Sequence, residues 1–203
     1  MLQNRVNPFG EIISTSDRGA WLGNRGVLHN DKQEIVRHYK IKAWITCVLE
    51  FRGRHREVMQ PNRWTELFFL DEATAFSAGH RPCFQCRYAD HQRFKSFWIK
   101  GNPEHGFNMK TPVSEIDNMM QAERIAADQS KITYEEQLAV LPNGTFVSYL
   151  DKAYLVNAGQ MYLWTSAGYE KPIAFPDLPT LPVLTPKSIV NMFSAGYLPQ
   201  ISV

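Results

Sequence analysis

The sequence predicts an α+β fold, and three patterns carry that prediction. Residues 39–51 alternate between apolar and polar side chains, and this period of two is typical of a β-strand. Residues 88–100 place Phe94, Phe97 and Trp98 at helical spacing, so these rings form one apolar stripe. Turn residues divide the C-terminal half into short segments that suit hairpins and a final helix. We therefore expect a small antiparallel sheet with short helices, followed by a C-terminal hairpin and helix extension.

The strand predicted over residues 39–51 leads into a basic turn. Its apolar face would include Ile45 and Cys47. Arg52-Gly53-Arg54-His55 suits a hairpin turn, and residues 56–59 would form the returning strand. Arg52, Arg54 and Arg56 make the turn strongly basic. Such a tip could contact phosphates, or it could be a charged edge that resists aggregation.

The remaining elements follow from helix caps and turn signals. We expect a helix over residues 88–100 and another over residues 112–129. The Asn143-Gly144 pair predicts a hairpin between residues 138–141 and 145–150, and residues 157–159 predict another between 154–156 and 161–164. Residues 169–186 are rich in proline and should run over the surface in extended form. Thr185-Pro186 should begin a last helix that ends at Gly196.

Residues 71–87 contain the most specific motif in the chain. Asp71 suits the N-cap of a short helix, and Gly79 suits the left-handed residue that ends one. Pro82 then restricts the backbone before Cys83, and Cys86 follows two residues later. A Cys-x-x-Cys turn directs both sulfurs at one point, about 2.3 Å each from a tetrahedral zinc ion. The alternatives are a redox dithiol, which usually begins a helix beside a parallel sheet, and two buried thiols. We predict a zinc knuckle around which the sheet and helices fold.

A tetrahedral zinc site needs two further ligands. Cys47 and His29 are the candidates, because Cys47 is the only other cysteine and His29 follows a glycine-rich segment. His80 and His91 flank the knuckle and could also serve. Each of these residues could instead be an ordinary core or surface residue.

Composition and charge narrow the class of protein. The chain has 203 residues, 44% of them hydrophobic and 21% charged, as expected of a folded domain. Three cysteines argue against a disulfide framework and for a reducing compartment. We see no leader segment and no apolar run of membrane-spanning length, so we expect a cytoplasmic protein without a membrane partner.

The charges are distributed unevenly along the chain. Residues 1–110 hold 17 Lys and Arg against 11 Asp and Glu, and residues 111–203 hold 5 against 9. The basic part contains the cysteine knuckle, and we expect a zinc-binding core over residues 1–110, with residues 111–203 packed on it as an extension or as part of one continuous domain. The basic half suggests an anionic partner, although a solvated surface with chance asymmetry is the other interpretation.

The segment from Ala78 to Arg87 resembles the second cysteine pair of the Ada metal-binding domain, the zinc module of methylphosphotriester DNA-repair proteins. That family has Ala-Gly-Phe-Arg-Pro-Cys-x-x-Cys-Arg, and here His80 replaces the aromatic residue. The resemblance covers residues 64–88 well and residues 20–63 loosely. As a whole, the chain resembles bacterial proteins that join an Ada-like core to a C-terminal extension.

The resemblance implies zinc binding but not the family's chemistry. Ada domains hold zinc through four cysteines, and one of these thiolates accepts a methyl group from DNA phosphate. Their first cysteine pair lies in a Gly-x-x-Cys-x-x-x-Cys segment, whereas this chain offers Gly26-Val27-Leu28-His29. Zinc binding therefore carries over to this chain, and methyl transfer does not.

From these patterns we predict a zinc-stabilised protein that binds nucleic acid, DNA in the first instance. Guanidinium groups match phosphate oxygens, so the basic half would make the contacts. The predicted phosphate-contacting residues are Arg25, Arg52, Arg54, Arg56, Arg81 and Arg87. One alternative is a zinc-dependent hydrolase or nuclease, or a thiolate that accepts alkyl groups. Another is a module for protein interactions in which zinc is purely structural.

Overall fold

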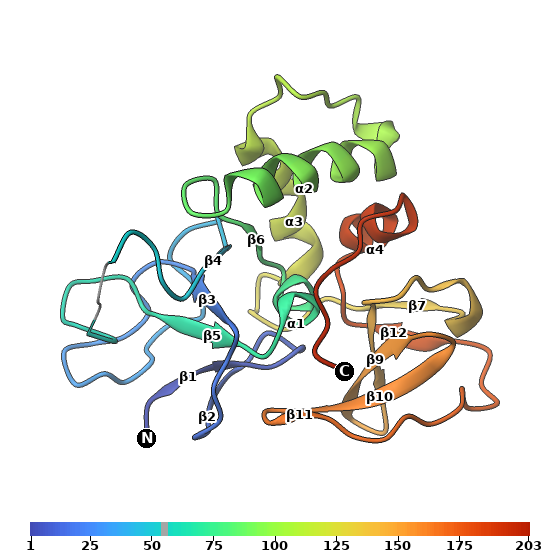
Figure 1. The fold of residues 1–203 in the computed structure, drawn as a ribbon, viewed down its shortest axis with the longest axis horizontal. Coiled ribbons are helices and arrows are strands. Elements are labelled where there is room, and N and C mark those ends of the chain that lie inside the picture. The colour runs from blue at the N-terminus through green and yellow to red at the C-terminus, as the bar shows by residue number, and fades with distance from the viewer. Residues whose placement is uncertain (54–56) are drawn as a thin grey trace.

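The computed structural model describes residues 1–53 and 57–203. In these residues, two six-stranded sheets and four α-helices form an α+β fold (Figure 1). The first sheet has the strand order β2 (Ile12–Ser14), β1 (Gln3–Val6), β5 (Leu67–Phe69), β3 (Trp21–Asn24), β4 (Ile45–Cys47) and β6 (Arg81–Pro82). The second has β11 (Gly168–Tyr169), β10 (Gln160–Thr165), β9 (Lys152–Asn157), β8 (Phe146–Tyr149), β12 (Leu181–Val183) and β7 (Tyr134–Glu136). The α-helices are α1 (Glu72–Ser77), α2 (Tyr88–Gly101), α3 (Val113–Arg124) and α4 (Lys187–Ser194). Short 3-10 helices cover Pro103–His105 and Leu138–Val140.

The first sheet is mixed rather than antiparallel as expected. Two of its pairs, β1 with β5 and β4 with β6, run parallel. The parallel β4–β6 pair forms one edge of the sheet and leads directly to the cysteines.

The strand predicted over residues 39–51 is much shorter in the structure. Only Ile45–Cys47 is a strand, because only this part has partners, β3 on one side and β6 on the other. Ile41 and Leu49, which the alternation placed on a buried face, are 42% and 53% exposed. The part of the predicted turn over residues 54–56 lies outside the described residues.

The second sheet is antiparallel throughout its described pairs. Ala158 and Gly159, both with positive φ, connect β9 to β10 within the segment where a turn is expected. Asn143-Gly144 does not form a hairpin, because residues 138–140 are a 3-10 helix and β8 pairs with β9 and β12 instead.

The proline-rich segment also differs from its prediction. Leu181–Val183 is not a surface strap but lies between β7 and β8 in the second sheet. Leu181 and Val183 are buried, and the amide of Leu184 donates to Phe146 O at 2.8 Å. Burial of the alternating residues Leu181 and Val183 therefore favours a strand in spite of the many prolines in this segment. Pro182 lies inside that strand.

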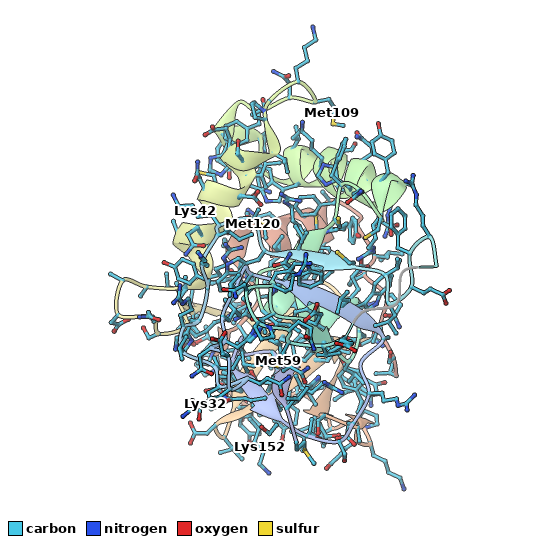
Figure 2. All side chains as sticks on the ribbon, turned by 90° about the vertical axis from the view of Figure 1, so that its left-hand side faces the viewer. Lys32, Lys42, Met59, Met109, Met120 and Lys152 are labelled. Carbon is cyan, nitrogen blue, oxygen red and sulfur yellow. The ribbon has the colours of Figure 1, made fainter. Side chains whose placement is uncertain are left out.

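Helix α1 lies between the two sheets, at the centre of the molecule (Figure 1). All six of its residues are buried, and it contributes to three apolar clusters through Ala73, Ala75 and Phe76. The apolar cluster that contains Phe76 also includes residues of α2, α3 and α4, so it joins parts of the chain on both sides of position 110. Its buried members are Phe76, Phe94, Trp98, Ile116, Met120, Ile189, Met192, Phe193 and Tyr197. Met59 lies in the interior, whereas Met109 projects at the periphery and is 47% exposed (Figure 2).

The helices agree closely with the sequence prediction. The helix expected over residues 88–100 is α2, whose Phe94 and Trp98 are fully buried. The one expected over residues 112–129 is α3, which ends earlier, at Arg124, because Ile125 turns to extended backbone. The last predicted helix is α4, and Gly196 follows it with a φ of 111°.

Candidate metal centre

Three cysteine sulfurs converge at the β4–β6 edge of the first sheet. Cys47 ends β4, and Cys83 directly follows β6. The parallel register aligns Thr46 with Pro82, and the Cys83 amide donates to Thr46 O at 2.8 Å. The sulfur atoms of Cys47, Cys83 and Cys86 all lie within 4.8 Å of one another. A tetrahedron with arms of about 2.3 Å separates its sulfurs by about 3.8 Å. A small inward movement would therefore suffice to bind a metal ion.

The local sequence explains how the Cys-x-x-Cys turn is presented. The Asp71 carboxylate caps α1 by accepting from the Thr74 amide at 2.8 Å. Gly79 has a φ of 82°, a left-handed conformation that glycine adopts without strain, and it redirects the chain into β6. Both features are as predicted. After β6 the turn closes where the Arg87 amide donates to Cys83 O at 3.1 Å.

Hydrogen bonds polarise the three thiols differently. The Cys83 sulfur accepts from the Gln85 amide at 3.4 Å. A hydrogen bond with Cys47, supported by the Gln85 and Cys86 amides, lowers the pKa of Cys83 to about 5. The same bond with Cys83, together with burial, raises the pKa of Cys47. Burial raises the pKa of Cys86, partly offset by the Val48 amide. A bound cation would favour thiolate at all three positions.

The donor set suits a soft metal ion. Three thiolates select Zn²⁺, Cu⁺ or iron–sulfur chemistry rather than Mg²⁺ or Ca²⁺. Among residues 1–53 and 57–203, no further His, Cys, Asp or Glu joins the group at comparable distance. His91 is 3% exposed, and its Nδ1 lies 3.2 Å from Pro82 O. Cys86 is half-buried, and its neighbour Phe84 is 59% exposed, so the group lies near the surface.

His29 is not placed in this group. Its ring nitrogens lie 2.6 Å from Thr65 Oγ1 and 3.2 Å from Gln60 O, and the residue is 5% exposed. His80 is also occupied, because its Nε2 accepts from Arg25 Nε at 3.1 Å. Within the described part of the chain, the structure therefore brings together three of the four predicted ligands.

Three of the predicted phosphate-contacting arginines are buried in the protein. Arg25 is 1% exposed, and Arg81 and Arg87 are 5% exposed. Arg81 forms a two-pronged ion pair with Asp117, with both N–O distances at 2.7 Å. This burial argues against direct contact between these three side chains and a nucleic acid. Arg52 is exposed, with its guanidinium 5.0 Å from the Phe51 ring. Arg54 and Arg56 lie outside the described residues.

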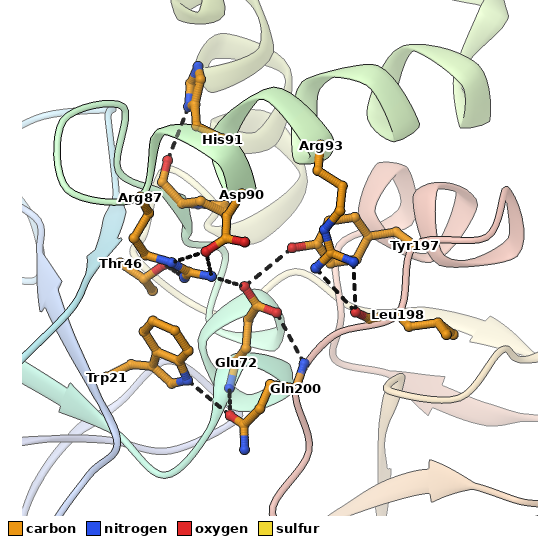
Figure 3. A network of polar contacts seen from close by, with 11 residues as sticks. Trp21, Thr46, Glu72, Arg87, Asp90, His91, Arg93, Tyr197, Leu198 and Gln200 are labelled. Carbon is orange, nitrogen blue, oxygen red and sulfur yellow. Dashed lines mark hydrogen bonds and ion pairs between the residues drawn. The ribbon is translucent and has the colours of Figure 1, made fainter.

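Arg87, directly after Cys86, is the centre of a buried polar network (Figure 3). It donates to Glu72 at 2.5 Å, to Thr46 at 2.8 Å and to Asp90 at 2.9 Å. Its guanidinium also lies 3.9 Å from the Trp21 ring. These contacts tie the knuckle to α1, β3 and β4, so Arg87 positions the cysteines. The sequence offers one signal for this role, the place of Arg87 directly after the motif.

Glu72 extends this network to the C-terminal segment. Its carboxylate accepts from the Gln200 amide at 3.1 Å and lies 3.3 Å from the Tyr197 hydroxyl (Figure 3). The Gln200 side chain in turn accepts from Trp21 Nε1 at 2.9 Å. Residues near the C-terminus thus support the cysteine group indirectly. Sequence reasoning missed this connection because the partners are 128 positions apart.

Comparison of the chain with protein-family models, with curated proteins and with solved structures gives no match. In the part of the chain that the structure describes, no helix combines the length and apolar character needed to cross a bilayer.

Proposed function

We propose that the protein binds one Zn²⁺ ion through Cys47, Cys83 and Cys86, and that the ion fastens the knuckle to the edge of the first sheet. One observation carries the proposal: sulfurs from two distant segments converge within 4.8 Å. Two of these residues, Cys47 and Cys83, are buried free thiols that pack in an apolar cluster with Leu22. Metal binding would supply folding free energy at this edge.

A structural role fits the surroundings of the group better than catalysis. Catalytic zinc sites place an acid or base within reach of the open position. Here the nearby His91 is buried, with its Nδ1 against Pro82 O, and Arg87 is committed to ion pairs. A zinc-bound hydroxide or a reactive thiolate is the alternative, and a solvent ligand at the fourth position would favour it.

Metal analysis of the purified protein tests the proposal. We expect one zinc per chain by mass spectrometry of the metal, and X-ray absorption dominated by three sulfur ligands. Cys47→Ser and Cys83→Ser should each lose most of the zinc. His29→Gln is the matched control and should retain it, since His29 bonds to Thr65 instead. Zinc loss in His29→Gln together with retention in Cys47→Ser would refute this ligand set.

Nucleic-acid binding is a second candidate, for which the aromatic rim of the knuckle is the supporting observation. Phe84 and Tyr88 are 59% and 55% exposed, and their rings meet edge to face at 5.2 Å. Exposed aromatic rings beside a cation-binding knuckle can stack on unpaired bases. The likeness of residues 78–87 to Ada-type domains points the same way. Arg25, Arg81 and Arg87 were expected to contact phosphate but are buried. The aromatic rings would therefore supply much of the affinity in place of these arginines.

Single-stranded oligonucleotides separate this candidate from a purely structural role. We expect Phe84→Ala with Tyr88→Ala to weaken binding by at least tenfold in a fluorescence anisotropy titration at fixed salt. Leu150→Ala is the control, because Leu150 is 72% exposed and lies in the second sheet's β8–β9 turn. No measurable binding at low salt, or equal affinity of both variants, contradicts the candidate.

A further inference from the structure

A cavity of about 310 Å³ lies where the segment after β3, the end of α1 and the segment after α3 meet. None of the three cysteines lines it. Its wall contains the cationic residues Arg25, Arg124 and Lys131, together with the apolar side chains of Phe9, Trp44 and Ile125. Its volume is at the lower end of the range of pockets that hold small molecules.

The two arginines are buried as cations without a carboxylate partner. Arg25 is 1% exposed and Arg124 is 2% exposed. Among the ion pairs of the described residues, none includes Arg25, Arg124 or Lys131. Asp117, whose charge acts on Arg124, is ion-paired with Arg81. The Trp44 ring lies 4.1 Å from the Arg25 guanidinium and 3.9 Å from that of Arg124, and these contacts offset part of the cost of burying the two charges. They do not supply a counter-charge, so the arrangement favours an anion.

Existing hydrogen bonds satisfy these groups only in part. Arg25 donates to Gly10 O at 3.0 Å, and Arg124 donates to Gly79 O at 2.7 Å. Lys131 donates to Ser77 O at 2.5 Å. Arg25 Nη2 and Arg124 Nε are buried with no hydrogen-bond partner. Two residues that line the cavity therefore each have one unpartnered donor.

The carbonyls at the end of α1 do not neutralise the three cations. Ser77 and Gly79 offer the partial negative charge of a helix C-terminus, which amounts to roughly half an elementary charge for a full helix. The full charges of the two arginines, together with the partial charge of Lys131, exceed that half charge. Among the described residues that line the cavity, only Glu11 is acidic, and it is exposed and bonded to Asn7 at 2.7 Å.

The electrostatics agree with this geometry. Burial, together with repulsion from Arg124, lowers the pKa of Arg25 to about 9. Burial also lowers the pKa of Arg124 to about 9. Burial and both arginines lower the pKa of Lys131 to about 7. An anion bound between the three groups would stabilise their charged forms and so raise all three pKa values.

We propose that this cavity binds a small tetrahedral oxyanion of charge −2, either free phosphate or the head group of a small phosphomonoester. The fork of a guanidinium and the ammonium of a lysine are suited to such oxygens. Phe9 and Ile125 line the same cavity, and their apolar side chains suit a small organic body beside the head group. The site is separate from the cysteine group and does not depend on the metal.

Calorimetric titration of the whole zinc-loaded protein tests the proposal, with sodium sulfate, sodium phosphate and phenyl phosphate as probes at constant ionic strength. We expect saturable binding of one anion per chain. Lys131→Met should weaken it by at least tenfold, because it removes one cation and preserves the side-chain volume. Lys110→Met is the matched control, since Lys110 is exposed and does not line the cavity. It should bind like the wild type.

The probes also identify the source of the anion. Tighter binding of phenyl phosphate than of phosphate assigns the cavity to a monoester, and equal affinities assign it to the free ion. If Lys131→Met does not fold, the wild-type titration alone tests the proposal, and saturable binding of one anion per chain supports it. Absence of saturable heat with all three probes overturns the proposal, as does equal affinity of Lys131→Met and wild type. Sulfate also stabilises most proteins because it is excluded from their surface. A rise in melting temperature with sulfate therefore supports the proposal only where it is larger in Lys110→Met than in Lys131→Met.

Discussion

Replacement of Arg81 by methionine should destabilise the protein without touching its surface. Arg81 opens β6, two residues before Cys83, and joins Asp117 on α3 through two contacts of 2.7 Å. Both side chains are almost fully buried, at 5% and 6% exposure. Solvent therefore cannot compensate the Asp117 carboxylate once its partner is gone.

The size of the effect follows from this burial. At 2.7 Å and an effective dielectric constant of 20, the gross attraction between unit charges is about 6 kcal/mol. Desolvation offsets much of that attraction in the intact pair. Removal of one partner of a buried pair typically costs about 3–5 kcal/mol, whereas replacing both by apolar residues can be neutral or stabilising. We expect Arg81→Met to lose about 3–5 kcal/mol and Arg81→Met with Asp117→Leu to recover most of it.

Chemical unfolding with urea at saturating zinc measures these differences. The matched control is Lys187→Met, which breaks an exposed ion pair with Glu136 at 3.1 Å. Exposed pairs contribute about 0–1 kcal/mol, so this variant should remain close to the wild type. The reasoning is refuted if Arg81→Met costs less than about 1 kcal/mol, or if the double variant is less stable than both single variants.

Three further predictions concern the thiols, the cationic cavity and the turn before the knuckle. In metal-free protein, Cys83 should react with iodoacetamide faster than Cys47 at pH 7, because its pKa is lowered to about 5 while that of Cys47 is raised. Peptide mass spectrometry with and without zinc checks both this order of alkylation and the protection of the cysteines by zinc. Sulfate affinity should fall as the pH rises from 6 to 8, because Lys131, whose pKa is lowered to about 7 by burial and by the two arginines, is cationic below that pH and neutral above it. The charged or titratable groups around Lys131 are Arg25, Arg124, His80, Glu11 and His38. The pH dependence should disappear in Lys131→Met and persist in His38→Gln, and a slope that Lys131→Met leaves intact would exclude Lys131 as its source. Gly79→Ala should cost more than about 1 kcal/mol, because φ is 82° and the added Cβ would lie 2.4 Å from Arg124 Cδ. Gly53→Ala, at φ 64° with open space around it, should cost less, and equal losses in thermal unfolding would contradict the steric argument.

Local signals in the sequence were sufficient for the elements around the cysteine group. The Asp71 cap, the Gly79 stop and the Cys83–Cys86 spacing depend on contacts between residues a few positions apart, and the structure has all three where they were predicted. The apolar stripe of α2 was equally readable. Such features are local because caps and turns use the backbone groups of their own segment.

Long-range pairing decided what local patterns could not. Whether Cys47 would reach the knuckle depended on the parallel register of β4 with β6, which joins segments 36 residues apart in sequence. The alternation around Cys47 predicted a strand of the right type but too long, since a strand persists only where neighbouring strands supply partners.

The roles of the arginines depended most on the tertiary structure. By itself the sequence determined that residues 1–110 are rich in positive charge and that two cysteines are spaced for a metal. Only the fold decided that Arg81 and Arg87 face carboxylates in the interior, whereas Arg25 faces a cavity beside two other cations. A guanidinium group has the same charge and donors wherever it stands in the chain. Its function is set by the dielectric surroundings and the acceptors that folding brings to it.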